Sequence, residues 1–390
     1  MQRFLKFSFC MLLKYVYFLL AIVISILYFS FAGEAQTDST SLKITGQKSY
    51  TFNLNYGWIY AHSIDIKNTA GAKPRGVSFE IVNRSTDTAV WNKYGSYPST
   101  GIMLTYLDLN TPILSKSYTA AYIFEPTFRL NNKMDFFIKT RIGLSYLTNP
   151  HDSLKNPTNN TYSTRFNFFT AAGLGITYKF NNHYSAVLDA NFFHNSNGGF
   201  DQPNRGLNYP NLSAGIRYDV ESNTTPTFRR IKDTSWKTDK WNYDAMAYYS
   251  PKEGYNYVWQ HKRKYLFGAG FQTSYRISSL DALTLGTEIY YDDAIGSIKR
   301  NLGDNSSNVY TGLLMGNEFI FRKIIFSQQL GFFLHKNTES YTDIYKQPFG
   351  LVYHRWGLRY RLQKHWYFGF NFLVHGHVAD FIDGRLIYRF

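Results

Sequence analysis

The sequence has little cysteine and, beyond its first residues, no long apolar run. Its single cysteine, Cys10, precedes the apolar N-terminal segment, and one cysteine alone cannot form a disulfide within the chain. After residue 35 no continuous apolar segment is long enough for a transmembrane helix. The chain also lacks a glycine-rich phosphate loop and a zinc-ligand spacing. These absences exclude a disulfide scaffold and a helical membrane protein.

The N-terminus has the layout of an export signal. Arg3, Lys6 and Lys14 form a basic segment, residues 15–32 are apolar, and small residues follow up to Ala35. We therefore expect residues 1–35 to be a signal peptide. The alternative is a retained membrane anchor, because the apolar run is nearly long enough to span a bilayer.

Aromatic side chains and positive charge are abundant. Aromatic residues make up 19% of the chain, and the formal net charge is +15. A basic balance can indicate nucleic-acid binding. In an exported barrel the polyanion is the phosphorylated lipopolysaccharide of the outer leaflet, so we expect this partner and no nucleic acid.

Period-two alternation is the main structural signal, because it places alternate side chains on opposite faces of a strand. It recurs in segments near 118–130, 133–146 and 165–179, each about ten residues or longer. One face is apolar and the other is polar or small, as in a barrel with lipid outside and a polar lumen. We expect Lys139, Arg141, Arg165 and Arg359 to face the lumen. A soluble β-sandwich also alternates, with its apolar face inward.

Short and long connections alternate along the chain, as expected when short turns face the periplasm and long loops face outward. This pattern predicts an all-β, outer-membrane-type antiparallel barrel of about 14–16 strands, with residues 36–390 forming a single outer-membrane β-barrel domain. Residues 221–241 depart from this alternation, because they are a long polar stretch at a place where a short periplasmic turn is expected. The chain ends in a strand closing with Phe390, and such a terminal strand resembles the signal read by the barrel assembly machinery. The sequence leaves open whether the barrel forms a homodimer.

One strand carries residues with catalytic chemistry. Continuing the outward register of strand 183–194 places His194 and Ser196 on the lipid-facing side, with Cα atoms roughly 6.6 Å apart at about 3.3 Å rise per residue. Polar groups are costly there unless they act at the membrane interface. A histidine that can accept a serine proton is the minimal equipment for acyl transfer. Alternatively, the pair only marks where the strand leaves the hydrocarbon.

The segment from His194 to Asn208 closely resembles the active-site segment of the lipid A 3-O-deacylase (PagL-like, acyloxyacyl hydrolase) family. It reads His194-Asn195-Ser196-Asn197-Gly198-Gly199-Phe200 and then Gln202-Pro203-Asn204-Arg205-Gly206-Leu207-Asn208. The resemblance is clearest over residues 100–220. The ending His375-Gly376-His377-Val378-Ala379-Asp380-Phe381 looks like the longer, Bacteroidetes-type members.

The resemblance implies an outer-membrane esterase that removes an ester-linked acyl chain from lipid A without metal or cofactor. Ser196 would be the nucleophile and His194 the general base. Asn204 and the Gly199 amide would serve the oxyanion hole, and Asn197 would position the loop.

The sequence departs from the family pattern at one position. Where better-known members carry a glutamate that orients the histidine, this chain has Asn208. An amide oxygen can accept the imidazole N–H, but it cannot stabilise an imidazolium by charge. Asp201 is the nearest substitute acid. Three alternatives to an active enzyme follow: an inactive homologue, a non-enzymatic pore or transporter, and a soluble lipid-binding β-protein.

Overall fold

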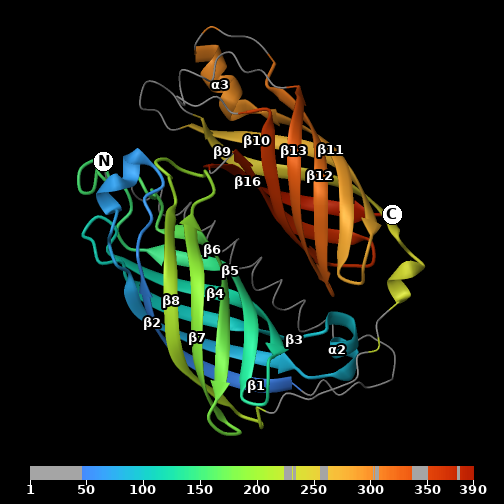
Figure 1. Cartoon of the computed structure of the whole chain (residues 1–390). Helices are drawn as coiled ribbons and strands as arrows, with labels where there is room; N and C mark the ends of the chain where they lie inside the picture. The colour runs from blue at the N-terminus through green and yellow to red at the C-terminus, as the bar shows by residue number, and fades with distance from the viewer. Residues whose placement is uncertain are drawn as a thin grey trace. The chain divides into compact units, whose positions relative to one another are not determined.

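The structure, a computed structural model, describes residues 46–223, 231, 234–254, 262–301, 303, 307–335, 350–375 and 378–390. The expected signal peptide, residues 1–35, lies outside the described residues. The described chain forms sixteen strands that close into two antiparallel barrels of eight strands each. In Figure 1 the first barrel runs from blue to green and the second from yellow to red.

The first barrel contains two short helical segments, η1 (Ile64–Thr69) and α2 (Thr88–Tyr94), in its connections. It closes where β1 pairs with β8, from Ser49 opposite Asp219 to Gly57 opposite Asn211. Its strands are β1 (Gly46–Gly57), β2 (Arg75–Ser85), β3 (Tyr97–Asp108), β4 (Lys116–Arg129), β5 (Met134–Leu147), β6 (Phe166–Lys179), β7 (Tyr184–Ser196) and β8 (Leu207–Asp219).

The second barrel closes where β16 pairs with β9. A short helix, η2 (Ser235–Lys237), precedes it, and α3 (Asp293–Asn301) lies in one of its connections. None of the described helices is both long and apolar enough to cross a bilayer. The strands are β9 (Trp241–Gly254), β10 (Lys262–Arg276), β11 (Asp281–Asp292), β12 (Val309–Phe321), β13 (Ile324–His335), β14 (Val352–Arg361), β15 (Trp366–His375) and β16 (Val378–Arg389).

The all-β antiparallel barrel fold is confirmed, and sixteen strands lie within the predicted range. The expectation of one barrel is wrong, because β1 pairs with β8 and not with β16. The long polar stretch at 221–241 is the reason: it falls between the end of β8 and the start of β9, and thus connects two closed sheets. The stretch begins at the end of the first barrel that the alternation of short and long connections indicates. It follows an even-numbered strand, as do the short turns at 130–133 and 180–183.

The alternating faces are confirmed on β7. Leu188 and Phe192 are 52% and 47% exposed, whereas Asp189 and Asn191, which alternate with them, are 1% and 6% exposed. Apolar side chains therefore cover the outside of the first barrel. Exposed tyrosines lie at the β6–β7–β8 end with short turns, namely Tyr178, Tyr184 and Tyr218, as in the aromatic girdles of membrane barrels.

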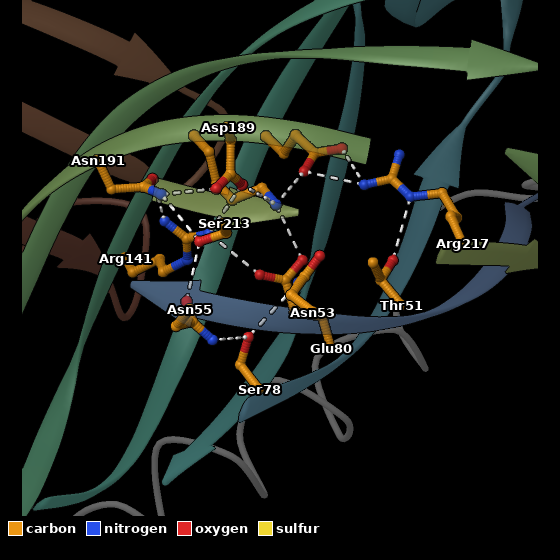
Figure 2. A network of polar contacts seen from close by, with 12 residues as sticks. Thr51, Asn53, Asn55, Ser78, Glu80, Arg141, Asp189, Asn191, Ser213 and Arg217 are labelled. Carbon is orange, nitrogen blue, oxygen red and sulfur yellow. Dashed lines mark hydrogen bonds and ion pairs between the residues drawn. The ribbon is translucent and has the colours of Figure 1, made fainter. Parts of the chain in front are cut away.

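Buried charges fill the middle of the first barrel. Lys139 Nζ lies 2.9 Å from Glu80, 3.1 Å from Glu125 and 3.2 Å from Asp189. Arg141 binds Glu80 and Asp189, and Arg217 binds Glu125. Figure 2 shows Glu80, Arg141, Asp189 and Arg217 of this network converging from several strands, together with Thr51, Asn53 and Ser213. Three cations thus face three carboxylates in a connected, charge-balanced network. The expectation for Arg165 is wrong: it precedes β6 and is exposed.

The second barrel is filled in the same way. Arg355 forms ion pairs of 2.8 Å with both Glu288 and Asp383. Arg359 lies 2.8 Å from Asp244, and Arg389 lies 2.7 Å from the same carboxylate. The lumen position predicted for Arg359 is confirmed, since it is 7% exposed.

Lys139→Met is expected to destabilise the first barrel by about 3–5 kcal/mol, because it leaves carboxylates buried without their shared cation. Chemical denaturation of the folded protein in detergent, followed by gel mobility, measures the change. Lys133→Met, at an exposed turn position, is the matched control and should leave the midpoint almost unchanged. Equal midpoints for the two variants would show that the interior network adds nothing to stability.

Candidate active site

His194 and Ser196 lie at the C-terminal end of β7, on the same face of the strand as Leu188 and Phe192. The pairing register places Ser196 opposite Phe168 and His194 opposite Thr170 of β6, while Asn208 of β8 lies opposite His194. The two residues therefore lie on the outward face of β7, at the end of the strand that continues into the loop 197–206. This is the orientation expected from the sequence. His194 is half-buried, and Ser196 is 7% exposed.

Asn208 holds the histidine. Its Oδ1 lies 2.5 Å from Nδ1 of His194, across the β7–β8 pair. An amide oxygen only accepts, so this contact requires a proton on Nδ1. Among the described residues, Nε2 of His194 has no hydrogen-bond partner, which leaves its lone pair free.

Two donors converge on the serine hydroxyl. Asn204 Nδ2 lies 2.9 Å from Ser196 Oγ, and the Gly198 amide lies 3.1 Å from the same atom. Within the described part of the chain, no hydrogen bond joins Ser196 Oγ to His194. The serine oxygen therefore lies among N–H donors, and donors at this place are near the carbonyl oxygen of an ester attacked by the serine.

The loop after Ser196 is held by the side chain of Asn197. Asn197 Nδ2 donates to the Asp201 carbonyl at 2.8 Å and to Ser163 Oγ at 3.1 Å, while its Oδ1 accepts from the Gly199 amide at 3.0 Å. The Asn197 amide in turn donates to Asn204 Oδ1 at 3.3 Å. This contact fixes the orientation of the Asn204 amide, with Nδ2 toward Ser196.

Glycine is required where this loop rejoins the barrel. Gly206 has φ +77°, and a Cβ there would approach Cε1 of His194 to 3.1 Å. Gly198, with φ +71°, makes the turn directly after the serine. Side chains at either position would strain the backbone beside the reactive pair.

The structure places two of the expected residues differently from the roles first assigned. The Gly199 amide is already bonded to Asn197 Oδ1, whereas the Gly198 amide faces Ser196. The Asp201 carboxylate accepts from the Gln202 amide at 3.0 Å. Asn208, and not Asp201, occupies the position beside Nδ1 of His194.

His62 also belongs to this site, although the sequence did not indicate it. Its Nδ1 lies 3.0 Å from Asn208 Nδ2, and its Nε2 lies 2.9 Å from the Arg205 carbonyl. The β1–β8 pairing brings it there, continued by the bond from the Tyr60 amide to the Asn208 carbonyl. One signal could have found it: His62 continues the even, outward parity of β1.

A buried tyrosine fixes the neighbouring loop 148–165. Tyr162 is fully buried at the end of the barrel, and its hydroxyl donates to the Leu114 carbonyl at 2.7 Å. Burial raises the pKa of Tyr162, so the hydroxyl stays protonated and remains a donor. The same loop presents Ser163 to Asn197 and accepts the Gly206 amide at the Thr161 carbonyl.

Fold and site together define a membrane β-barrel with a serine and a histidine on the outward face of one strand. Two family models match consecutive parts of the chain: lipid A 3-O-deacylase (PagL) over residues 82–217, and acyloxyacyl hydrolase, C-terminal domain, over residues 241–390. Together they cover more than half of the chain, which therefore belongs to the lipid A 3-O-deacylase (PagL) family. This is a family of lipid A deacylases, and its members are outer-membrane β-barrels.

Curated protein sequences give no match to this chain. The structure is similar to Neisserial surface protein A, with a TM-score of 0.30 and 15% identity over 44% of this chain and 97% of that one. It is also similar to the N-terminal β-barrel domain of Pseudomonas aeruginosa OprF, with a TM-score of 0.27 and 11% identity over 44% of this chain and 99% of that one.

Proposed function

We propose that the first barrel is a serine esterase that hydrolyses an ester-linked acyl chain of lipid A at the outer leaflet. The observation that supports the proposal is the register of β7, which puts Ser196 and His194 on the same face as the exposed Leu188 and Phe192, beside two N–H donors. An acyl ester of a lipid reaches this surface without leaving the bilayer.

The mechanism requires no cofactor. Ser196 Oγ attacks the ester carbonyl, and its proton moves to Nε2 of His194. The tetrahedral intermediate collapses, the sugar alkoxide leaves with the proton from His194, and the acyl chain stays on Ser196. Water then attacks the acyl-serine with His194 again as base, and the fatty acid and free serine result. Asn208 keeps the imidazole in the tautomer that can accept the first proton.

Asn204 and the Gly198 amide are the proposed oxyanion donors, with Gly199 one residue further along the loop. Both donors are within 3.1 Å of Ser196 Oγ, close to where the carbonyl oxygen becomes negative. Donors that are fixed before the reaction cost no reorganisation when the charge develops. Asn197 holds the loop that supplies them.

The filled interiors favour this proposal over a pore. Lys139 and Arg355, which lie in the middle of the two barrels, are fully buried in ion pairs. A conducting lumen would keep such charges hydrated. Recognition of the C-terminal strand by the barrel assembly machinery and formation of a homodimer stay predictions.

Purified protein incubated with lipopolysaccharide tests the function. We expect release of free fatty acid and a matching mass loss of one acyl chain from lipid A. A catalytically inactive homologue gives neither product although it is folded, as judged by heat-modifiable gel mobility. Conductance in planar bilayers without fatty acid release would instead indicate a pore.

Asn208→Leu is expected to lower kcat by about 10²–10⁴-fold, because the imidazole loses the acceptor that fixes its tautomer. Asn208→Asp keeps an acceptor and adds a charge that stabilises imidazolium, so its kcat should equal or exceed that of the wild type. Initial rates of fatty acid release measure both variants. Equal loss in the two would mean that position 208 does not orient the base.

A further inference from the structure

We propose that His62 is a positioning residue that sets which way the Asn208 amide points and, through it, which nitrogen of His194 carries the proton. The inference rests on the proposed function and extends it to a residue outside the His194–Asn208 segment. Its basis is a hydrogen-bonded chain that runs from the Arg205 carbonyl through His62 and Asn208 to His194.

The Arg205 carbonyl fixes which group donates and which accepts along this series of hydrogen bonds. A backbone carbonyl can only accept, so Nε2 of His62, 2.9 Å from the Arg205 oxygen, must carry a proton. Nδ1 of a neutral His62 is then an acceptor, and Asn208 Nδ2 donates to it at 3.0 Å. The Asn208 Oδ1 is thereby directed at Nδ1 of His194, which must be protonated. Nε2 of His194 is left as the base.

An amide requires this support and a carboxylate does not. The two ends of an asparagine side chain differ in hydrogen bonding, and a reversed Asn208 would offer N–H to His194 and favour the wrong tautomer. A carboxylate offers oxygen in either orientation. His62 therefore compensates for the absence of an acid at position 208.

A double-mutant cycle tests the coupling. His62→Ala is expected to lower kcat about tenfold in the wild-type background, because the Asn208 amide loses the acceptor that orients it. In the Asn208→Asp background the same change should alter kcat less than threefold. A residue that only supports the fold would give the same loss in both backgrounds, and that outcome would overturn the proposal.

A conservative variant gives a second readout. His62→Gln keeps an acceptor for Asn208, so it should retain most of the wild-type kcat. A loss in His62→Gln as large as that in His62→Ala would contradict the role of His62.

Imidazole ¹⁵N spectra separate this inference from the esterase proposal, because they need no turnover. The His194 signal, identified by its loss in His194→Gln, should show the Nδ1–H tautomer in the wild type. In His62→Ala it should shift toward Nε2–H. A wild-type Nε2–H tautomer, or no change in His62→Ala, rejects the positioning role. Expected spectra without fatty acid release reject only the esterase.

Discussion

Ser196→Ala is expected to lower the rate of fatty acid release by roughly 10³–10⁶-fold, because no other group can form the acyl-enzyme. Binding of lipopolysaccharide should persist, since the hydroxyl is small and the apolar surface around it is unchanged. The measurement is the initial rate with purified, folded variant in detergent micelles. KM, where turnover is measurable, should change little.

Ser153→Ala is the matched control for this variant. Ser153 is exposed in the loop 148–165, so its replacement removes a hydroxyl from the same end of the barrel without touching the site. Its rate should equal that of the wild type. Undiminished turnover in Ser196→Ala would remove the nucleophile from the proposed mechanism.

Asn204→Ala is expected to lower kcat by about 10²–10³-fold, the usual cost of one oxyanion donor, or about 2.7–4 kcal/mol of barrier. The Nδ2 group that lies 2.9 Å from Ser196 Oγ is lost, and the Gly198 amide alone remains. Because the donor acts on developing charge, KM should stay nearly constant. Steady-state kinetics on lipopolysaccharide separate the two parameters.

Asn132→Ala, in an exposed turn at the opposite end of the first barrel, controls for the loss of an asparagine amide and should be neutral. Asn204→Asp is the sharper comparison, because it preserves shape while replacing the donor with an acceptor. It should be at least as impaired as Asn204→Ala. A rise in KM with constant kcat would assign Asn204 to substrate binding and not to the transition state.

Strand faces could be predicted from the sequence because they depend on local alternation. Leu188 and Phe192 are exposed and Asp189 is buried, as the period of two indicates. Closure could not be predicted in this way, because it depends on which distant strand accepts the free edge of β1. That edge pairs with β8, and only the long segment between β8 and β9 pointed to a second barrel.

The residues of the candidate site also differ in whether they could be predicted from local sequence. His194 and Ser196 are two residues apart, so their shared face followed from strand geometry, and the contact between His194 and Asn208 joins neighbouring strands. His62 is 146 residues from Asn208 and reaches it only because the barrel closes. The difference between the Gly198 and Gly199 amides depends on loop torsions that alternation does not encode.

In the proposed function, the Ser196 hydroxyl and the His194 imidazole on the outward face of the first barrel deacylate lipid A in the membrane. The most direct test is the lipid A mass spectrum of Gram-negative cells that express either the intact chain or Ser196→Ala at equal outer-membrane levels. We expect loss of one hydroxyacyl chain with the intact protein and full-length lipid A with the variant. Identical spectra from the two strains would contradict it.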